Sequence, residues 1–375
     1  MIKLFVTGDV HIGKKYDRYP HIKDTLIQSR FDCLDRAVKQ AEKEACDYFV
    51  ITGDLFDRLN AIKVGDVKKV VDILAAFNGS VIVLPGNHDF YSGEEKLWKD
   101  FQTQMAKTDH NITLITEFKE YTFETGGETI TFYPAFCDSK HSKTNKLDWI
   151  KQTEMNDSTY HVGIAHGSIE GLSPDMKNEY FLMSEGELKS IPVDAWLIGH
   201  THIPYPADLP AEGDAEGYRI FNAGTPAQTD LSNNTEGYCF VVSLEKVQDK
   251  AVVSAHRYKS GEIRFFDIEA KASEGSLESV IKTATENLPD ESVIRLTVSG
   301  TVDTEDYQDR QSIYEDALDR FITFDVEDSA LCERITDEKI RAEFAEAGFA
   351  AEFLRNISDP KELQMAYDLI KRHQE

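Results

Sequence analysis

Five short polar clusters, each directly after a run of apolar residues, constrain this chain more than any other feature. The apolar runs cover residues 4–6, 48–51, 81–84, 162–165 and 196–198. Such runs are typical of strands buried on both faces of a sheet, and open α/β sheets bind ligands beyond the carboxyl ends of their strands. The five segments can therefore bring carboxylate, imidazole and amide groups to one rim, which predicts a metal site. The clusters are Asp9-Val10-His11, Gly53-Asp54-Leu55-Phe56-Asp57, Gly86-Asn87-His88-Asp89, His166-Gly167 and Gly199-His200-Thr201-His202.

Length and composition favour a globular protein with one large domain and a smaller one. The chain has 375 residues, 41% of them hydrophobic and 29% charged. No apolar run approaches the length of a membrane helix, and residues 1–6 already read as a strand, so we expect neither a membrane association nor a cleaved signal peptide. The five cysteines are scattered and include no Cys-x-x-Cys pair. They predict reduced, packed thiols in a cytoplasmic protein.

Taken over the whole chain, the net charge argues against a protein that binds nucleic acid. The net charge is −26, which repels phosphate at long range. The acidic residues are unevenly distributed, because residues 303–346 hold fifteen acids against five bases, whereas residues 1–40 hold eight Lys and Arg against five Asp. The acidity is therefore concentrated in the C-terminal region, away from the first polar cluster.

The first third of the chain alternates predicted strands with predicted helices. Apolar residues at helical spacing predict a helix over 24–45 and a second over 64–77, between the strands at 4–6, 48–51 and 81–84. This β-α-β order is typical of a mostly parallel sheet. From about residue 111 the pattern changes to a hairpin, with strands at 121–124 and 129–133 around a Gly-Gly turn. A second sheet packed against the first is expected.

The remainder of the chain predicts further strands and then a separate C-terminal region. Strands are expected at 218–222, 236–244, 251–258 and 262–268, and the small polar residues 269–275 are expected to form a linker. After the linker we expect a helix near 276–287, a strand at 292–298, a helix near 306–322 and two more helices that end at Arg372. The predicted domains are 1–268 and 276–375.

The ligand types and their spacing predict two metal ions. Asp9 and His11 lie two residues apart at a strand end, where both side chains can face one cation, and Asp54 can bridge two cations. The set contains oxygen and nitrogen donors without a thiolate, which suits Mn²⁺, Fe or Zn²⁺. Two metals close together clamp the attacking and leaving oxygens of an in-line displacement at phosphorus and generate hydroxide near neutral pH. The predicted ligands are Asp9, His11, Asp54, Asn87, His166, His200 and His202.

His88 follows Asn87 directly and can reach the site without being a ligand. We expect it to protonate the leaving oxygen or to stabilise charge on the phosphoryl group, with Asp89 orienting its imidazole and raising its pKa. Gly53, Gly86 and Gly199 each precede a predicted ligand, where tight turns and close backbone approach favour glycine.

Taken singly, several of these motifs also have an ordinary structural explanation. An isolated Asp-x-His, or His166 alone as a hydrogen-bonded core histidine, is more often structural than functional, whereas Gly-Asn-His-Asp and Gly-His-Thr-His favour a site. The order and placement of the motifs favour a functional site over a structural role. All five motifs follow predicted strands, and together they supply carboxylate, imidazole and amide ligands.

The order of these motifs resembles that of the calcineurin-like metallophosphoesterase superfamily over residues 1–268. The Gly-Asp-x-x-Asp and Gly-Asn-His-Asp motifs, Ala165-His166-Gly167 and the 222–226 loop further resemble the SbcD/Mre-type DNA-repair nuclease subunit, and the strand at 292–298 resembles the DNA-capping domain of that family. The resemblance implies an α/β fold, a four-layer αββα sandwich with a small α+β C-terminal cap. It also implies Mn²⁺-dependent exonuclease or endonuclease activity on DNA, a coiled-coil SbcC/Rad-type ATPase as partner, and a homodimer through helices near 63–77 and 94–106.

Three functions remain open from the sequence. The first is a DNA nuclease, for which Lys14, Lys15, Arg18 and Lys23 are candidate backbone contacts, with Tyr16 and Tyr19 as candidate base contacts. The second is a small-molecule phosphodiesterase or phosphatase, for example on cyclic nucleotides, which the acidic surface favours. The third is a non-catalytic scaffold, which the complete ligand set disfavours.

Overall fold

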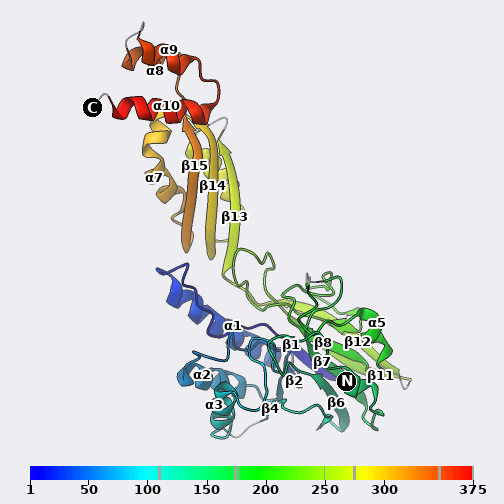
Figure 1. Ribbon diagram of the computed structural model, residues 1–375. Helices are drawn as coiled ribbons and strands as arrows, with labels where there is room; N and C mark the ends of the chain where they lie inside the picture. Colours follow the sequence, from blue (N-terminus) through cyan, green and yellow to red (C-terminus); the bar gives the residue numbers. More distant parts are fainter. Residues whose placement is uncertain are drawn as a thin grey trace. The chain divides into compact units, whose positions relative to one another are not determined.

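The chain divides by its internal contacts into two compact units, Met1–Glu262 and Ile263–Glu375. The computed structural model describes residues 1–108, 111–172, 175, 177–248, 250–272, 276–344 and 348–373. Figure 1 shows the first unit in blue to green and the second in yellow to red. Each unit has hydrophobic clusters of its own, so each is described separately.

A seven-stranded sheet forms the first layer of strands in the first unit. Its order is β4-β3-β2-β1-β11-β12-β9, in which β1 to β4 are parallel and β11 pairs antiparallel with both β1 and β12. The helices α1 (Lys23–Lys43), α2 (Val64–Ala75) and α3 (Lys96–Met105) connect the parallel strands. The strands are β1 (Ile2–Thr7), β2 (Tyr48–Ile51), β3 (Ser80–Val83), β4 (Ile112–Leu114), β9 (Ala215–Glu216), β11 (Tyr238–Val247) and β12 (Lys250–Lys259).

A five-stranded sheet forms the second layer, in the order β10-β8-β7-β6-β5. The hairpin of β5 and β6 is antiparallel, and the remaining pairs are parallel. Two short helices, α4 (Asp148–Lys151) and α5 (Glu185–Ser190), follow β6 and β7. The strands are β5 (Tyr121–Thr125), β6 (Glu128–Ala135), β7 (Tyr160–His166), β8 (Ala195–Gly199) and β10 (Ile220–Phe221).

Side-chain alternation along the strands produces four layers. In β1, Phe5 packs into the cluster that includes residues of α1, α2 and α3, whereas Leu4 and Val6 point into the cluster between the two sheets. On the second sheet, Trp196 belongs to a third cluster that packs against α4 and α5. The strands β1, β2, β3, β7 and β8 are therefore buried on both faces, which explains their continuous apolar runs. This arrangement confirms the predicted αββα sandwich.

The second unit is built on a three-stranded parallel sheet in the order β13-β14-β15. Its core contains Ile294, Leu296 and Val298 of the central strand, packed against α6 and α7. A smaller cluster joins the last three helices. The elements are β13 (Arg264–Ala272), α6 (Leu277–Thr285), β14 (Ser292–Val302), α7 (Thr304–Leu318), β15 (Thr323–Glu333), α8 (Asp337–Glu343), α9 (Phe349–Arg355) and α10 (Pro360–Arg372).

The division between the units differs from the predicted boundary at residue 268. The strand predicted at 262–268 is β13, and it pairs along its whole length with β14 rather than with the first unit. Of the predicted linker, residues 269–272 belong to β13, and 273–275 lie outside the described residues. The prediction failed because strand partners are non-local, so a local change in composition does not reveal them.

Two further elements of the second unit were missed. Strand β15 alternates Phe324 and Val326 with the exposed acids Asp325 and Glu327, and this acidic content hid a strand that is only half buried. The described residues of the C-terminal segment form three helices, α8 to α10, where two were predicted. Short helices of this kind are set by tertiary packing more than by local propensity.

Two predictions from composition can be compared with the structure. All five cysteines are buried and unpaired, as the packed, reduced state requires. Within the described ranges, none of the helices has the length and apolar character needed to cross a membrane.

Candidate metal centre

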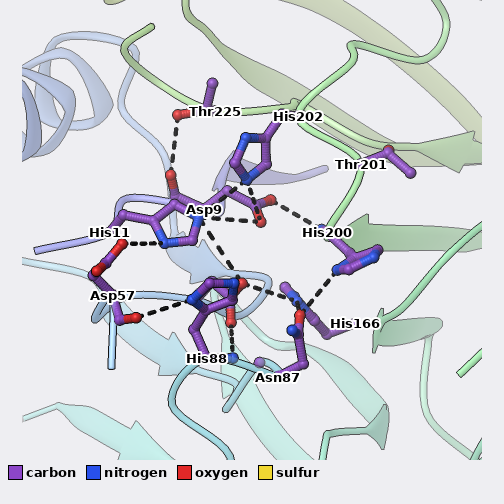
Figure 2. Close-up of polar contacts among 12 residues, drawn as sticks. Asp9, His11, Asp57, Asn87, His88, His166, His200, Thr201, His202 and Thr225 are labelled. Carbon is purple, nitrogen blue, oxygen red and sulfur yellow. Dashed lines mark hydrogen bonds and ion pairs between the residues drawn. The ribbon is translucent and has the colours of Figure 1, made fainter. Parts of the chain in front are cut away.

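The predicted ligands lie together at the carboxyl ends of five strands from both sheets (Figure 2). Asp9 and His11 follow β1, Asp54 follows β2, and Asn87 follows β3 in the first sheet. His166 is the last residue of β7 in the second sheet, and His200 and His202 follow β8. Parallel strands end at one edge of a sheet, so the two sheets bring all seven side chains to a shared rim.

One group of donors, here named the Asp9 cluster, consists of Asp9, His11 and His202. The His11 Nε2 and His202 Nε2 atoms are 3.0 Å apart. Asp9 Oδ1 lies 3.3 Å from His202 Nε2 and 4.0 Å from His11 Nε2. The three atoms thus face one small volume at distances that fit coordination of a single cation.

A second group, named the Asp54 cluster, consists of Asp54, Asn87, His166 and His200. Asn87 Oδ1 lies 3.0 Å from His166 Nε2 and 2.9 Å from His200 Nδ1. Asp54 Oδ2 lies 3.4 Å from His166 Nε2. His166 Nδ1 donates to the Thr52 carbonyl oxygen at 2.8 Å, which leaves the Nε2 lone pair directed at the cluster.

The Asp54 carboxylate lies between the two clusters. Its Oδ2 atom is 3.4 Å from His166 Nε2 of one cluster and 3.9 Å from His11 Nε2 of the other. Its Oδ1 atom accepts the His88 backbone N–H at 2.8 Å, which fixes the carboxylate plane. This is the position that a bridging carboxylate requires.

The backbone is strained where the ligands occur. Asp9, His11, Asp54, His200 and His202 all have positive φ angles, of 51°, 52°, 50°, 109° and 45°. Non-glycine residues adopt this conformation rarely and at a free-energy cost, and such residues gather at functional sites. The surrounding hydrogen bonds must therefore hold these ligands in place.

Two glycines make room for the ligands. A Cβ atom at Gly86 would lie 2.2 Å from Asp54 Oδ1, and one at Gly53 would lie 2.0 Å from His166 Nδ1. Gly53 also has a φ of 106°. The predicted role of these glycines in close backbone approach is confirmed by this geometry.

Burial and charge shift the pKa values of the site residues in opposite directions. Burial alone would lower the pKa of His166, but the Asp54 carboxylate beside it raises that pKa to about 9. Burial and the positive charge of His166 lower the pKa of His200 to about 4. Burial opposes ionisation of Asp54, yet the neighbouring His166 and His11 hold its pKa below the usual range. The site thus stabilises the negative charge of the Asp54 carboxylate next to imidazole rings.

The donors fit a pair of divalent cations. Asp9 is fully buried, and its Oδ1 atom has no hydrogen-bond partner among the described residues, although an unpaired buried carboxylate oxygen is costly. The same atom is directed at the two imidazoles of the Asp9 cluster. A cation at that point would satisfy it, and the oxygen and nitrogen donors suit Mn²⁺, Fe or Zn²⁺.

His88 lies beside the clusters with one ring nitrogen engaged. Its Nδ1 atom is 2.9 Å from the Asp57 carbonyl oxygen, which can only accept, so Nδ1 carries the proton, and none of the described residues hydrogen-bonds Nε2. The His88 ring meets the His11 ring edge-on at 4.9 Å. The second nitrogen of His88 is thus available to a ligand at the site.

The predicted role of Asp89 is wrong. Its carboxylate accepts the backbone N–H groups of Gly86 at 2.7 Å and Phe56 at 2.9 Å, and it makes no contact with the His88 ring in the described structure. Burial and the nearby Asp54 charge raise the pKa of Asp89 to about 8. Asp89 therefore joins the turns after β2 and β3. The error arose because adjacent residues on a turn point in different directions.

Several residues that shape the site were not predicted as part of it. The Asp57 carboxylate lies 3.5 Å from His11 Nδ1, the ring nitrogen that does not face His202, and so orients the His11 ring. The sequence carried a signal, since Asp57 closes the Gly-Asp-x-x-Asp motif. Tyr180 packs on His200 with ring centroids 5.0 Å apart, and no local pattern indicated it. Thr225 Oγ1 lies 3.0 Å from the Asp9 carbonyl oxygen (Figure 2), and the Ala227 carbonyl oxygen, at 2.7 Å, competes for its one proton.

The chain is similar to known proteins of one family. The calcineurin-like phosphoesterase family model matches residues 2–204, which include every predicted ligand. The chain is 22% identical over 201 residues to the uncharacterized metallophosphoesterase YhaO of Bacillus subtilis. That match covers 52% of this chain and 47% of the relative, so it spans about half the length of YhaO.

Two solved structures resemble the chain at low sequence identity. TT1561 of Thermus thermophilus has a TM-score of 0.39 at 11% identity, covering 64% of this chain and 93% of that one. The calcineurin-like phosphoesterase YfkN of Bacillus subtilis has a TM-score of 0.39 at 14% identity, covering 68% and 89%. The family model, which matches more than half of the chain, decides the class: the chain belongs to the calcineurin-like phosphoesterase family. Divalent metals are used throughout this family. Among the described residues, three groups could hold a cation: one is the Asp9 cluster, one lies in the Asp54 cluster, and the third joins His11 to Asp57 and His88.

Proposed function

We propose that this chain is a two-metal phosphodiesterase that cleaves DNA, using Mn²⁺, as the nuclease subunit of a complex with a coiled-coil SbcC/Rad-type ATPase. The observation that carries the two-metal assignment is the Asp54 carboxylate between two donor clusters. When bound, two divalent cations supply a nucleophile at neutral pH and neutralise charge on a phosphoryl group.

His88 supports the phosphodiesterase assignment. Its Nε2 atom can hold a proton near the leaving oxygen or donate to a phosphoryl oxygen, because its Nδ1 atom is engaged by the Asp57 carbonyl. That engagement also fixes the ring plane. His88 forms with His11 and Asp57 a group that could hold a cation, so we assign His88 to turnover and test by metal content whether it is a ligand.

The choice of DNA rests on the resemblance and on a small set of cations beside the first motif. Lys15 and Arg18 are exposed, and no acidic partner contacts them in the parts of the chain that the structure describes. Lys14 and Lys23 are paired with Asp230 and Asp17. The predicted stacking role of Tyr16 is wrong, since its ring is 5% exposed. Lys15 and Arg18 are thus the proposed phosphate contacts.

The net charge of −26 favours a second candidate, a small-molecule phosphodiesterase or phosphatase. One experiment separates the two. The full chain with Mn²⁺ is assayed on linear single- and double-stranded DNA, on bis-p-nitrophenyl phosphate and on p-nitrophenyl phosphate, with Asp54→Ala as the inactive control. Cleavage of DNA and of the diester supports the nuclease. Hydrolysis of the small esters with no cleavage of any DNA, alone or with a coiled-coil ATPase, rejects it.

We also propose a homodimer formed through α2 and α3. Their inner faces are buried against the sheet, and Val64 at the start of α2 is 46% exposed. Light scattering on the full chain measures the molar mass in solution, and a monomer at micromolar concentration would reject the dimer.

A further inference from the structure

The loop of residues 136–146, here named the β6 loop, begins beside the metal centre. It follows β6, which pairs parallel with β7, so it leaves the second sheet at the same edge as His166, the last residue of β7. The Cys137 thiol donates to the His166 carbonyl oxygen at 3.4 Å. Cys137 is completely buried, so this contact is shielded from water. The start of the β6 loop is therefore held against a predicted ligand.

A second segment, residues 178–183, fixes the middle of the β6 loop. Ser142 donates its backbone N–H to the Glu179 carbonyl oxygen at 2.7 Å and accepts the Phe181 N–H at 3.0 Å. Phe181 is 2% exposed and has a φ of 53°. A bulky residue holds such a conformation only where the surrounding structure enforces it, and such residues gather at functional sites. The β6 loop thus has a defined position at the rim.

A row of three rings joins the β6 loop to the Asp54 cluster. The ring centroid of His141 lies 5.1 Å from that of Tyr180, which lies 5.0 Å from that of His200. His200 is a predicted metal ligand, whereas His141 is exposed. Two steps of about 5 Å equal about three nucleotides of a strand, at about 3.4 Å each. A strand whose scissile phosphate lies at the metals can therefore reach His141.

Two lysines of the β6 loop are exposed and carry charge that the loop itself does not balance. None of the acidic side chains in the described ranges forms an ion pair with Lys140 or Lys143. The third lysine, Lys146, is paired with Asp138 at 2.7 Å. Residues 139–147 contain no acid, although the whole chain has a net charge of −26. Two such cations beside the metal centre suit a polyanionic substrate, because phosphate groups are the partners of exposed lysines at nucleic-acid sites.

We propose that the β6 loop is a binding surface for a single nucleic-acid strand, on which Lys140 and Lys143 bind phosphates beside the scissile one and His141 stacks on a base. The proposal rests on the proposed function, because it assigns the strand a path from the metal centre across the second sheet. Lys15 and Arg18 follow β1 in the first sheet, so both sheets contribute cations. The substrate class is then an oligonucleotide, which makes contacts that a small phosphodiester is too short to reach.

The test measures binding without cleavage. The full chain in EDTA is titrated into a fluorescein-labelled single-stranded oligonucleotide of about 16 nucleotides, and anisotropy gives the Kd at about 50 to 200 mM KCl. Each lysine that neutralises a phosphate of a single strand contributes about 0.7 to the slope of log Kd against log salt. Lys140→Ala combined with Lys143→Ala should therefore lower that slope by about 1.4 and weaken binding. Arginine at both positions should restore the slope and the affinity.

Lys246→Ala combined with Lys250→Ala is the matched control. Both lysines are exposed on the hairpin of β11 and β12, and the pairing of Leu244 with Ile2 places that hairpin at the amino end of β1, opposite the metal ligands. The net charge changes by the same amount, so the control should keep the wild-type slope. An unchanged slope in the β6 loop variant overturns the proposal, and so does an equal decrease in the control.

His141→Ala tests the base contact. Stacking of one base on an aromatic ring changes Kd by about fivefold or more, so His141→Ala should weaken binding by that factor and His141→Phe should not. The loss should vanish on an abasic oligonucleotide. Equal Kd values for wild type and His141→Ala overturn the base contact.

Two further outcomes separate this surface from the proposed function. A wild-type chain that binds no oligonucleotide at about 50 mM salt overturns the surface, while cleavage with a coiled-coil ATPase still tests the nuclease. Binding through the β6 loop without cleavage of any DNA in Mn²⁺ rejects the nuclease and supports the surface.

Discussion

The Nε2 atoms of His11 and His202 face each other at 3.0 Å in the Asp9 cluster. His11 Nδ1 points at the Asp57 carboxylate, which favours a proton on Nδ1 and a lone pair on Nε2. A hydrogen bond between the rings then needs the proton on His202 Nε2, whereas a shared cation uses both lone pairs. Asp9 Oδ1, only 3.3 Å from the same His202 atom, adds the charge that favours the cation.

Asp54→Ala should remove at least one of the two metals. The carboxylate is within 4 Å of imidazoles from both clusters, so its loss leaves each cluster without a shared anion. We expect metal content measured by mass spectrometry to fall from two ions per chain to one or none. Activity on bis-p-nitrophenyl phosphate should fall at least about 100-fold. Asp35→Ala on the exposed face of α1 is the control, and full occupancy in Asp54→Ala would refute the bridging role.

Metal affinity should increase with pH up to about 9. In the metal-free protein His166 has a pKa of about 9, so it carries a proton at neutral pH that a metal must displace. Each unit of pH below 9 should weaken binding at the Asp54 cluster by up to about tenfold. Calorimetry with Mn²⁺ between pH 6.5 and 9 measures this slope. A Kd that stays constant over that range would contradict the prediction.

The same proton has the opposite effect on folding of the metal-free chain. A raised pKa means that protonated His166 stabilises the folded state below its unfolded pKa of about 6.5, and that this stability is lost as pH rises through about 9. The midpoint of thermal unfolding without metal should therefore decrease between pH 6.5 and 9, as followed by circular dichroism. His166→Gln should make the decrease smaller, and the part that remains up to about pH 8 comes from Asp89, whose pKa is raised to about 8.

His88→Ala should separate turnover from metal binding. The His88 Nδ1 atom bonds the Asp57 carbonyl oxygen, so the ring is positioned by the main chain and not by a metal. Loss of a general acid or of a charge-stabilising donor costs typically 10²- to 10⁴-fold in rate. We expect such a loss of kcat on bis-p-nitrophenyl phosphate, with two Mn²⁺ ions retained. A parallel loss of one ion would make His88 a ligand instead.

The seven predicted ligands could be identified from the sequence because the pattern that marks each of them is local. Each predicted ligand stands within a few residues of a continuous apolar strand, and strand ends of a parallel sheet meet at one edge. Gly53 and Gly86 could be placed for the same reason, since each precedes its ligand directly. The structure brings all seven predicted ligands into the two clusters and their shared carboxylate.

The features that could not be predicted from the sequence depend on contacts between distant segments. Thr225 contacts Asp9 across 216 residues, and Tyr180 reaches His200 from a loop without a periodic pattern. Strand β13 was assigned to the wrong domain because its partner, β14, lies beyond a helix. Asp89 was given the wrong partner because adjacency in sequence was taken for contact, although its carboxylate faces two backbone N–H groups instead.

Asp89→Asn tests that structural role directly. An asparagine keeps one acceptor and places an NH₂ group against a backbone N–H of Gly86 or Phe56, so one buried donor loses its partner. At pH 9, where Asp89 with its pKa of about 8 is ionised, the metal-free chain should lose about 1–3 kcal/mol of unfolding free energy in urea, against no measurable loss in the exposed control Asp72→Asn. Because Asp89 does not contact the His88 ring, the pH dependence of kcat should keep its wild-type midpoints. A shifted midpoint with unchanged stability would restore the orienting role that the hydrogen bonds argue against.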